Sequence, residues 1–183
     1  MHPPFVSLCP EITRSDALNL IDWLQDECVT RYLSDSRHVS RFIEQVIGRV
    51  QLPILTHLFN QGGRFLMLCD GHDIPVGFVR LVKTGPVCEM VLVIGNRDNW
   101  GRQLGASAIR EAMKLAFLEM RAERLIAKVH PDNARSLKVF QRSGFLLESQ
   151  TPALRSFAMT SERYLRLLRA SAAGHADHIH ITE

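Results

Sequence analysis

The segment Glu89–Ala108, "EMVLVIGNRDNWGRQLGASA", joins an apolar run, a turn with two glycines and the start of a helix. A helix N-terminus exposes about four unpaired N–H groups and a partial positive charge, so it can bind phosphate through its backbone. Gly101 and Gly105 let a ligand approach the main chain, and Arg102 adds a charged donor. The turn therefore predicts a phosphate or pyrophosphate site, unless both glycines serve only the turn.

Two helices are predicted upstream of this turn from apolar residues three and four positions apart. The first begins at Ser15, with Ser15 or Asp16 as its cap. Its apolar stripe contains Leu18, Ile21, Trp23, Leu24 and Cys28. The second helix spans about His38–Val50, with Phe42, Val46 and Ile47 on one face. The pattern does not determine the state of Leu52–Asn60, where Pro53 indicates a break or a new start.

Strands are predicted where short apolar runs are bounded by turn residues. Before the helices, Phe5–Cys9 is a short strand. The later strands are Arg64–Cys69, Ile74–Val82 and Val87–Gly95, joined by turns at Asp70–Gly71 and Thr84–Pro86. Because the connections are short, these three strands form an antiparallel meander.

Beyond the turn, a long helix is predicted from Leu104 to Met120 and is followed by the strand Glu123–His130. The next helix is capped by Asp132 or Asn133 and ends at Gly144. Two short strands, "FLLES" and "LRSFAMT", complete the order, which is α+β with a mixed sheet. We expect a single domain over residues 1–165. Residues 166–183 form a C-terminal end whose small, polar tail from Ala170 is expected to be mobile.

Composition narrows the class of protein. In 183 residues, 46% are apolar and 22% charged, as in soluble globular domains, and no apolar run is long enough for a membrane span. The N-terminus lacks the pattern of a secretion signal. The four cysteines show no C-x-x-C spacing and lie in apolar contexts, so we expect buried, reduced thiols, no metal site and a cytoplasmic location. A net charge of +3 with dispersed arginines disfavours a nucleic-acid-binding domain.

Three motifs carry a resemblance to a known family. "WGRQLG", Trp100–Gly105, resembles the W-G-x-G-x-G/A pyrophosphate turn of GNAT acetyltransferases. "HPDNARSLKVFQRSGF", His130–Phe145, resembles the N-x-x-[AS]-x-x-x-[YF]-x-x-x-G-F of the same family. "WLQDECVTRYLSD", Trp23–Asp35, is similar to the first helix and acceptor loop of the branch with ribosomal-protein N-terminal and polyamine acetyltransferases. The resemblance covers about Ser15–Thr160.

The resemblance implies a GNAT fold, with a mostly antiparallel sheet that splays open at the cofactor cleft and is flanked by helices. It also implies acetyl-coenzyme A as acyl donor, bound by three sets of residues. The strand contributes main-chain groups around Leu92, Val93 and Ile94; the turn contributes Trp100, Gly101, Arg102, Gln103, Leu104, Gly105 and Ala106; and the following helix contributes Asn133, Ser136 and Phe140.

Some of these residues depart from the family pattern or have a second explanation. Gln103 stands where the family has its middle glycine, so its side chain either points away or weakens the cofactor site. Phe140 stands where many members have the tyrosine thought to protonate the leaving thiolate. For Asn133, a plain helix cap is at least as good an explanation as a cofactor contact.

Two side chains are candidates for the general base that acyl transfer to an amine needs. Glu89 interrupts an apolar strand and would act through water, or it faces solvent on the other side of the strand. His130 ends a strand and carries a side chain of a type suited to base chemistry, although a histidine there is more often only exposed.

The acceptor is expected to be a primary amine, either a small molecule or a protein N-terminus. Asp26, Glu27 and Asp35 would attract a cationic amine, and Trp23 would line its pocket or belong to the core. The alternative function is a coenzyme-A-binding module with weak or no catalysis, motivated by Gln103 and Phe140. No nucleic-acid or membrane partner is expected, and the protein would be a monomer or a homodimer. The tail histidines resemble a metal cluster but lie in an unpatterned segment.

Overall fold

The computed structural model describes residues 5–33 and 36–176, and its centre is one sheet. Within the described residues the sheet has seven strands in the order β1-β2-β3-β4-β5-β7-β6. Their bounds are β1 Ser7–Cys9, β2 Arg64–Cys69, β3 Pro75–Thr84, β4 Val87–Ile94, β5 Arg124–Val129, β6 Leu146–Gln150 and β7 Arg155–Thr160. Only β4 and β5 pair in parallel, and every other neighbouring pair is antiparallel. The predicted α+β class with a mixed, mostly antiparallel sheet is confirmed.

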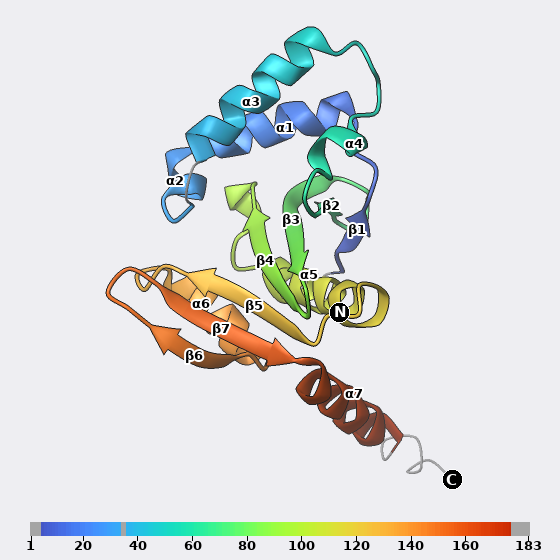
Figure 1. Ribbon diagram of the computed structural model, residues 1–183, viewed down its shortest axis with the longest axis vertical. Coiled ribbons are helices and arrows are strands. Elements are labelled where there is room, and N and C mark those ends of the chain that lie inside the picture. The colour runs from blue at the N-terminus through green and yellow to red at the C-terminus, as the bar shows by residue number, and fades with distance from the viewer. Residues whose placement is uncertain (1–4, 34–35, 177–183) are drawn as a thin grey trace.

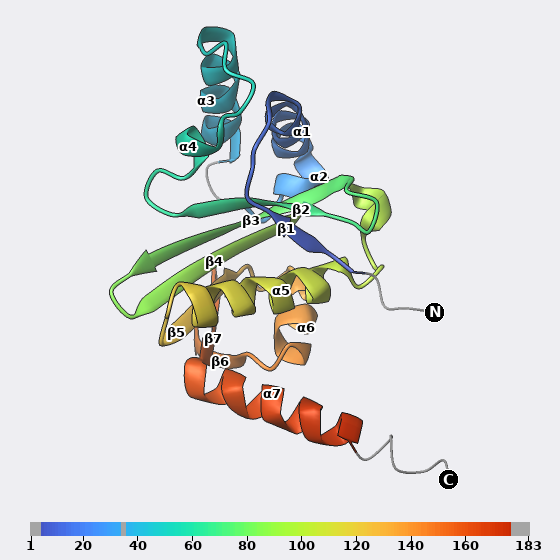
Figure 2. The same cartoon turned by 90° about the vertical axis from the view of Figure 1, so that its right-hand side faces the viewer.

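Helices cover both faces of this sheet. Their bounds are α1 Arg14–Gln25, α2 Glu27–Thr30, α3 Ser36–Arg49, α4 Thr56–Phe59, α5 Leu104–Lys114, α6 Ala134–Arg142 and α7 Ser161–Ala176. A 3₁₀ turn, Arg97–Asn99, precedes α5, and a π-helical turn, Leu115–Glu119, extends it. α1 and α3 lie on one side of the β1–β4 half, α5 lies on the other side, and α7 projects away from the body (Figures 1 and 2).

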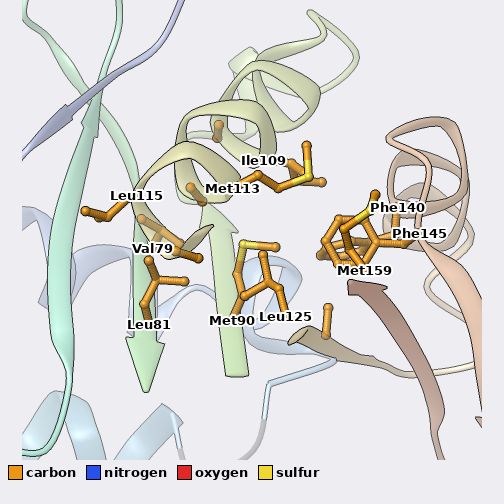
Figure 3. Packing of buried hydrophobic residues seen from close by; sticks show 14 of the residues in the cluster. Val79, Leu81, Met90, Ile109, Met113, Leu115, Leu125, Phe140, Phe145 and Met159 are labelled. Carbon is orange, nitrogen blue, oxygen red and sulfur yellow. The ribbon is translucent and has the colours of Figure 1, made fainter. Parts of the chain in front are cut away.

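The alternation of side chains along the strands produces two apolar cores. Val79, Leu81 and Met90 point towards α5 and α6, into a cluster that Figure 3 shows from close by. Phe78, one position before Val79, and Val93, three positions after Met90, point towards α1 and α3 on the opposite face. The sheet therefore holds α5 firmly against the carboxyl end of β4, where the glycine-containing turn lies.

The start and the faces of the first helices differ from the prediction. Thr13, rather than Ser15 or Asp16, caps α1: its hydroxyl accepts from the Asp16 N–H at 3.2 Å, and the Asp16 carboxylate accepts from the Thr13 N–H at 2.9 Å. Leu18 and Phe42, expected in apolar stripes, are 52% and 55% exposed. Both lie on the outer sides of helices whose buried contacts come from other apolar positions.

The C-terminal segment forms a helix that the sequence analysis did not predict. α7 continues to Ala176, although the residues after Ala170 show no apolar period. The remainder of the expected mobile tail, with His178 and His180, lies outside the described residues. In the described part of the chain, no helix combines the length and apolarity needed to cross a membrane. Nor do three His, Cys, Asp or Glu side chains meet there as a possible metal site.

Candidate active site

The cleft is built by the divergence of β4 and β5. The two strands pair only where Val87–Glu89 lies beside Arg124–Ile126. Beyond these residues β4 continues to Ile94 and β5 to Val129, and Figure 1 shows the strands separating. The expected splay of the sheet is therefore present, and it leaves backbone groups of both strands at an open edge.

Backbone direction identifies which groups of β4 face this opening. The Gly95 N–H donates to the Val76 carbonyl at 2.9 Å, so the N–H and C=O groups of Gly95 point towards β3. Because these directions alternate along a strand, those of Leu92 and Ile94 point towards β5. The Ile94 carbonyl accepts from the Trp100 indole N–H at 2.9 Å, which agrees with this direction. Leu92 thus presents a donor and an acceptor at the cleft.

Val93 does not share this role. Its register partner is Phe78 on β3, and its side chain is buried beneath α1. Of the three β4 residues implied by the resemblance, Leu92 and Ile94 therefore lie with their main chain towards the opening, and Val93 belongs to the core.

The turn before α5 adopts a left-handed backbone at two positions. Gly101 has a φ of 82° and Gln103 a φ of 61°. The exposed Gln103 side chain makes no cap hydrogen bond, whereas its carbonyl accepts from the N–H groups of Ala106 and Ser107. Among the described residues, the N–H groups of Leu104 and Gly105 have no acceptor. Two backbone donors are thus available at the start of α5.

Small residues keep this helix start accessible. A Cβ placed on Gly105 would meet only a methyl group of Val139 at 3.8 Å, and Arg102 is exposed beside it. Ser107 serves another purpose, because its buried hydroxyl accepts from the Val6 N–H at 3.1 Å and ties β1 to α5. The donors, the small residue and the arginine fit a phosphate group.

Two stacked pairs lie at the mouth of the cleft. The Arg135 guanidinium lies 3.5 Å from the centre of the Trp100 ring, and this contact joins the turn before α5 to the first turn of α6. The Tyr32 ring stacks on His130 with centroids 5.2 Å apart and joins the segment after α2 to the end of β5. A cavity of about 650 Å³ is lined by Glu27, Cys28, Thr30, Arg31, Tyr32, Trp100 and Arg135.

His130 is held by its own chain. The backbone N–H of Asp132 donates to Nδ1 of His130 at 3.2 Å. The Asp132 carboxylate lies 3.9 Å from the same nitrogen, and the histidine side chain is 40% exposed. Nδ1 is therefore occupied as an acceptor in the neutral ring.

Glu89 is the last residue of β4 that pairs with β5, opposite Ile126, at the point where these two strands separate. Its carboxylate pairs with the Lys128 ammonium at 2.7 Å, and its side chain is 37% exposed. The Glu89 side chain is thus partly open to solvent, as the second of the two sequence-based interpretations expected. Its position at the branch point still places it beside the open edge.

The α6 residues divide between core and surface. Phe140 is only 6% exposed and lies beside Phe145 in the core (Figure 3), where the two rings meet edge-on. It therefore supplies no polar group to the cleft. The Asn133 side chain accepts from the Ser136 N–H at 3.2 Å, so its helix-cap role is confirmed. Asn133 and Ser136 are both partly exposed at the start of α6.

The acidic residues expected near an acceptor are engaged or undescribed. Asp26 pairs with Arg97 at 3.3 Å and caps α2, whereas Asp35 lies outside the described residues. Glu27 lines the cavity. Cys28, expected to be buried, is exposed beside Arg97, with 3.2 Å between sulfur and guanidinium. The Trp23 ring packs on Gly95, where any Cβ would overlap it.

Tyr32 and Arg135 are the site residues that sequence reasoning missed. Arg135 lies inside the recognised "NARS" motif, yet the motif gives no reason to select it. Tyr32 lies in the "WLQDECVTRYLSD" stretch that resembles the acceptor loop, which gives no reason to select it either. Both became apparent through contacts with residues distant in sequence.

Comparisons with known proteins identify the family of this chain. The family model for the acetyltransferase (GNAT) domain matches residues 10–146. A Bacillus licheniformis protein named "uncharacterized N-acetyltransferase p20" is 25% identical over 139 residues, which are 72% of this chain and 76% of that protein.

Solved structures share the fold at low identity. Spermidine N-acetyltransferase from Vibrio cholerae, in complex with coenzyme A and spermine, has a TM-score of 0.68 and 13% identity over 87% of this chain and 98% of that one. The aminoglycoside acetyltransferase AAC(6')-Ib, in complex with coenzyme A, has a TM-score of 0.67 and 15% identity over 89% of this chain and 98% of that one. The matched domain covers most of the chain, which therefore belongs to the GNAT acetyltransferase family.

Proposed function

We propose that this protein transfers the acetyl group of acetyl-coenzyme A directly to a primary amine. The observation that carries the proposal is the pair of open N–H groups at Leu104 and Gly105 beside the splayed strands, in a chain of the GNAT family. Two structural neighbours are named for amine acceptors, spermidine and aminoglycosides. An amine acceptor for this protein is consistent with both.

We assign the binding of acetyl-coenzyme A to the backbone groups that the turn before α5 and strand β4 expose. The pyrophosphate would accept from the N–H groups of Leu104 and Gly105, with Arg102 as a charged neighbour. The amide-containing arm would run along the open edge of β4, where Leu92 offers one donor and one acceptor. The thioester would then lie in the opening between β4 and β5, beyond their last paired residues.

The chemistry requires a neutral amine at this point. The amine nitrogen attacks the thioester carbon, a C–N bond forms, and the C–S bond breaks to release the coenzyme A thiolate. Glu89 is assigned as the base that removes the amine proton through water, because it is the carboxylate at the branch point. Lys128 holds this carboxylate at 2.7 Å.

The test is release of free thiol from acetyl-coenzyme A across a panel of polyamines, aminoglycosides, amino acids and N-terminal peptides. Wild-type turnover with at least one amine is expected. Glu89→Gln should lower kcat about 100-fold or more, with unchanged coenzyme A affinity. Glu148→Gln is the matched control, because Glu148 is also an ion-paired strand carboxylate with similar exposure. A wild-type rate for Glu89→Gln would remove Glu89 from this role.

A coenzyme-A-binding module without catalysis is the second candidate. It is favoured by Phe140, which places an apolar ring in the core at the position of the family's tyrosine. Calorimetric binding of coenzyme A together with no thiol release on the whole panel would support this candidate over transfer.

A further inference from the structure

We propose that neutral His130 donates a hydrogen bond from Nε2 to the negative charge that develops on the thioester, and that Tyr32 positions its ring. The inference rests on the proposed acetyl transfer and gives His130 a different role from that of a base. It follows from the hydrogen bond that Nδ1 accepts, which leaves the proton of the neutral ring on Nε2. Phe140, which is buried in the core, supplies no such polar group.

The hydrogen bond at Nδ1 fixes the tautomer. Because the Asp132 N–H donates to Nδ1 at 3.2 Å, the neutral ring carries its single proton on Nε2. An amine proton could be taken up only at Nδ1, which would break this bond and turn the ring towards the Asp132 carboxylate 3.9 Å away. Nε2 is thus a donor in the neutral ring, and base chemistry there is disfavoured.

Two contacts fix the position of the ring that carries this donor. Nδ1 turns back to the residues that follow β5, so Nε2 lies on the far side of the ring from its own chain. The Tyr32 ring stacks on one face at 5.2 Å and an interplanar angle of 29°. Tyr32 also lines the cavity at the mouth of the cleft. A donor held in this way needs no reorganisation when charge develops, which is how fixed donors accelerate acyl transfer.

The step balances without proton transfer from histidine. The amine nitrogen forms the C–N bond, the C–S bond breaks, and coenzyme A leaves as a thiolate that solvent protonates. The amine proton leaves through water to Glu89. His130 keeps its proton throughout, because a neutral imidazole is too weak an acid to give it up.

Substitutions separate a donor from a base. His130→Gln keeps an N–H donor but cannot take up a proton, and His130→Ala has neither property. In single-turnover acetyl transfer we expect His130→Ala to lose about 100-fold and His130→Gln to remain within about tenfold of wild type. His72→Gln, in an exposed turn, is the control. A His130→Gln rate as low as that of His130→Ala would overturn the inference, as would a wild-type rate for His130→Ala.

Tyr32 is tested as a positioning residue. Tyr32→Ala should lower the rate about tenfold without changing coenzyme A affinity, and Tyr32→Phe, which keeps the stacked ring, should recover most of the rate. If both variants are equally slow, stacking is not the cause.

A spectroscopic readout is independent of turnover. Imidazole ¹⁵N spectra, with His130 assigned by its loss in His130→Gln, should show the neutral ring protonated at Nε2. A ring protonated at Nδ1 would overturn the inference. Absence of wild-type turnover on every amine would instead count against the proposed transfer reaction.

Discussion

Substituting Gly105 by glutamate should have opposite effects on folding and on donor binding. Gly105 is the second residue of α5, its N–H has no acceptor among the described residues, and a Cβ there meets only Val139 at 3.8 Å. A side chain therefore fits the free protein without displacing its neighbours. A carboxylate in this position would occupy the place that we assign to the pyrophosphate.

The expected magnitudes follow from helix energetics and charge. Replacing glycine by a better helix former gains up to about 1 kcal/mol, less in a first turn, and an acid near a helix N-terminus adds about 0.3–1 kcal/mol. We expect a net gain of about 1 kcal/mol in the free energy of unfolding. Loss of one charge-assisted hydrogen bond, at about 1.5–3 kcal/mol, weakens binding about 10- to 100-fold, and repulsion weakens it further.

The assay pairs urea unfolding with calorimetric titration of coenzyme A. Gly105→Gln is the matched control, since it adds nearly the same volume without charge and should be less stable and bind more tightly than Gly105→Glu. The difference in affinity between the two variants should shrink at high salt, because screening weakens the repulsion. Coenzyme A binding to Gly105→Glu at wild-type affinity would refute the placement of the pyrophosphate.

Three further substitutions test the turn before α5, the buried hydroxyl of Tyr164 and the packing of Trp23 on Gly95. Gln103→Gly should relieve a left-handed backbone and gain about 0.5 kcal/mol in the free energy of unfolding, and Arg121→Gly, at a φ of 54°, should do the same. Only Gln103→Gly should also tighten coenzyme A binding. Equal coenzyme A affinities of the two variants would contradict this. Tyr164→Phe should raise the melting temperature by about 2–4 °C, because the Tyr164 hydroxyl is buried with no hydrogen-bond partner among the described residues. The same burial raises the pKa of Tyr164. A lower melting temperature of the variant would reveal a hydrogen-bond partner. Gly95→Ala should cost about 1–3 kcal/mol in urea unfolding by displacing Trp23, and Trp23→Leu should recover part of this cost; additive losses would disprove the contact.

Local patterns predicted most of the fold. β2 coincides with the predicted Arg64–Cys69, and Gly144 ends α6 with a φ of 88°. The cap of α1 was missed because Ser15 and Asp16 lie nearer to the first apolar residue of the predicted stripe, although Thr13 and Asp16 have capping-box spacing. α7 was not predicted, because it projects from the body and buries Tyr164 rather than a full apolar stripe.

The site was predictable where it depends on backbone and not where it depends on tertiary contact. The turn follows from its glycines, and the splay of β4 and β5 was implied by the family resemblance. The stacking of Tyr32 on His130 and of Arg135 on Trp100 joins residues far apart in sequence, and no local pattern reports such a contact. The tautomer of His130 likewise depends on the geometry of the chain that follows β5.

The most direct test of the account is amide hydrogen exchange of the full chain with and without coenzyme A. We expect coenzyme A to slow exchange in peptides covering Leu92–Gly105 and Asn133–Ser136, and to leave α3 and α7 unchanged. Binding with protection confined to other segments, or no protection at the start of α5, would contradict the placement of the donor in this cleft.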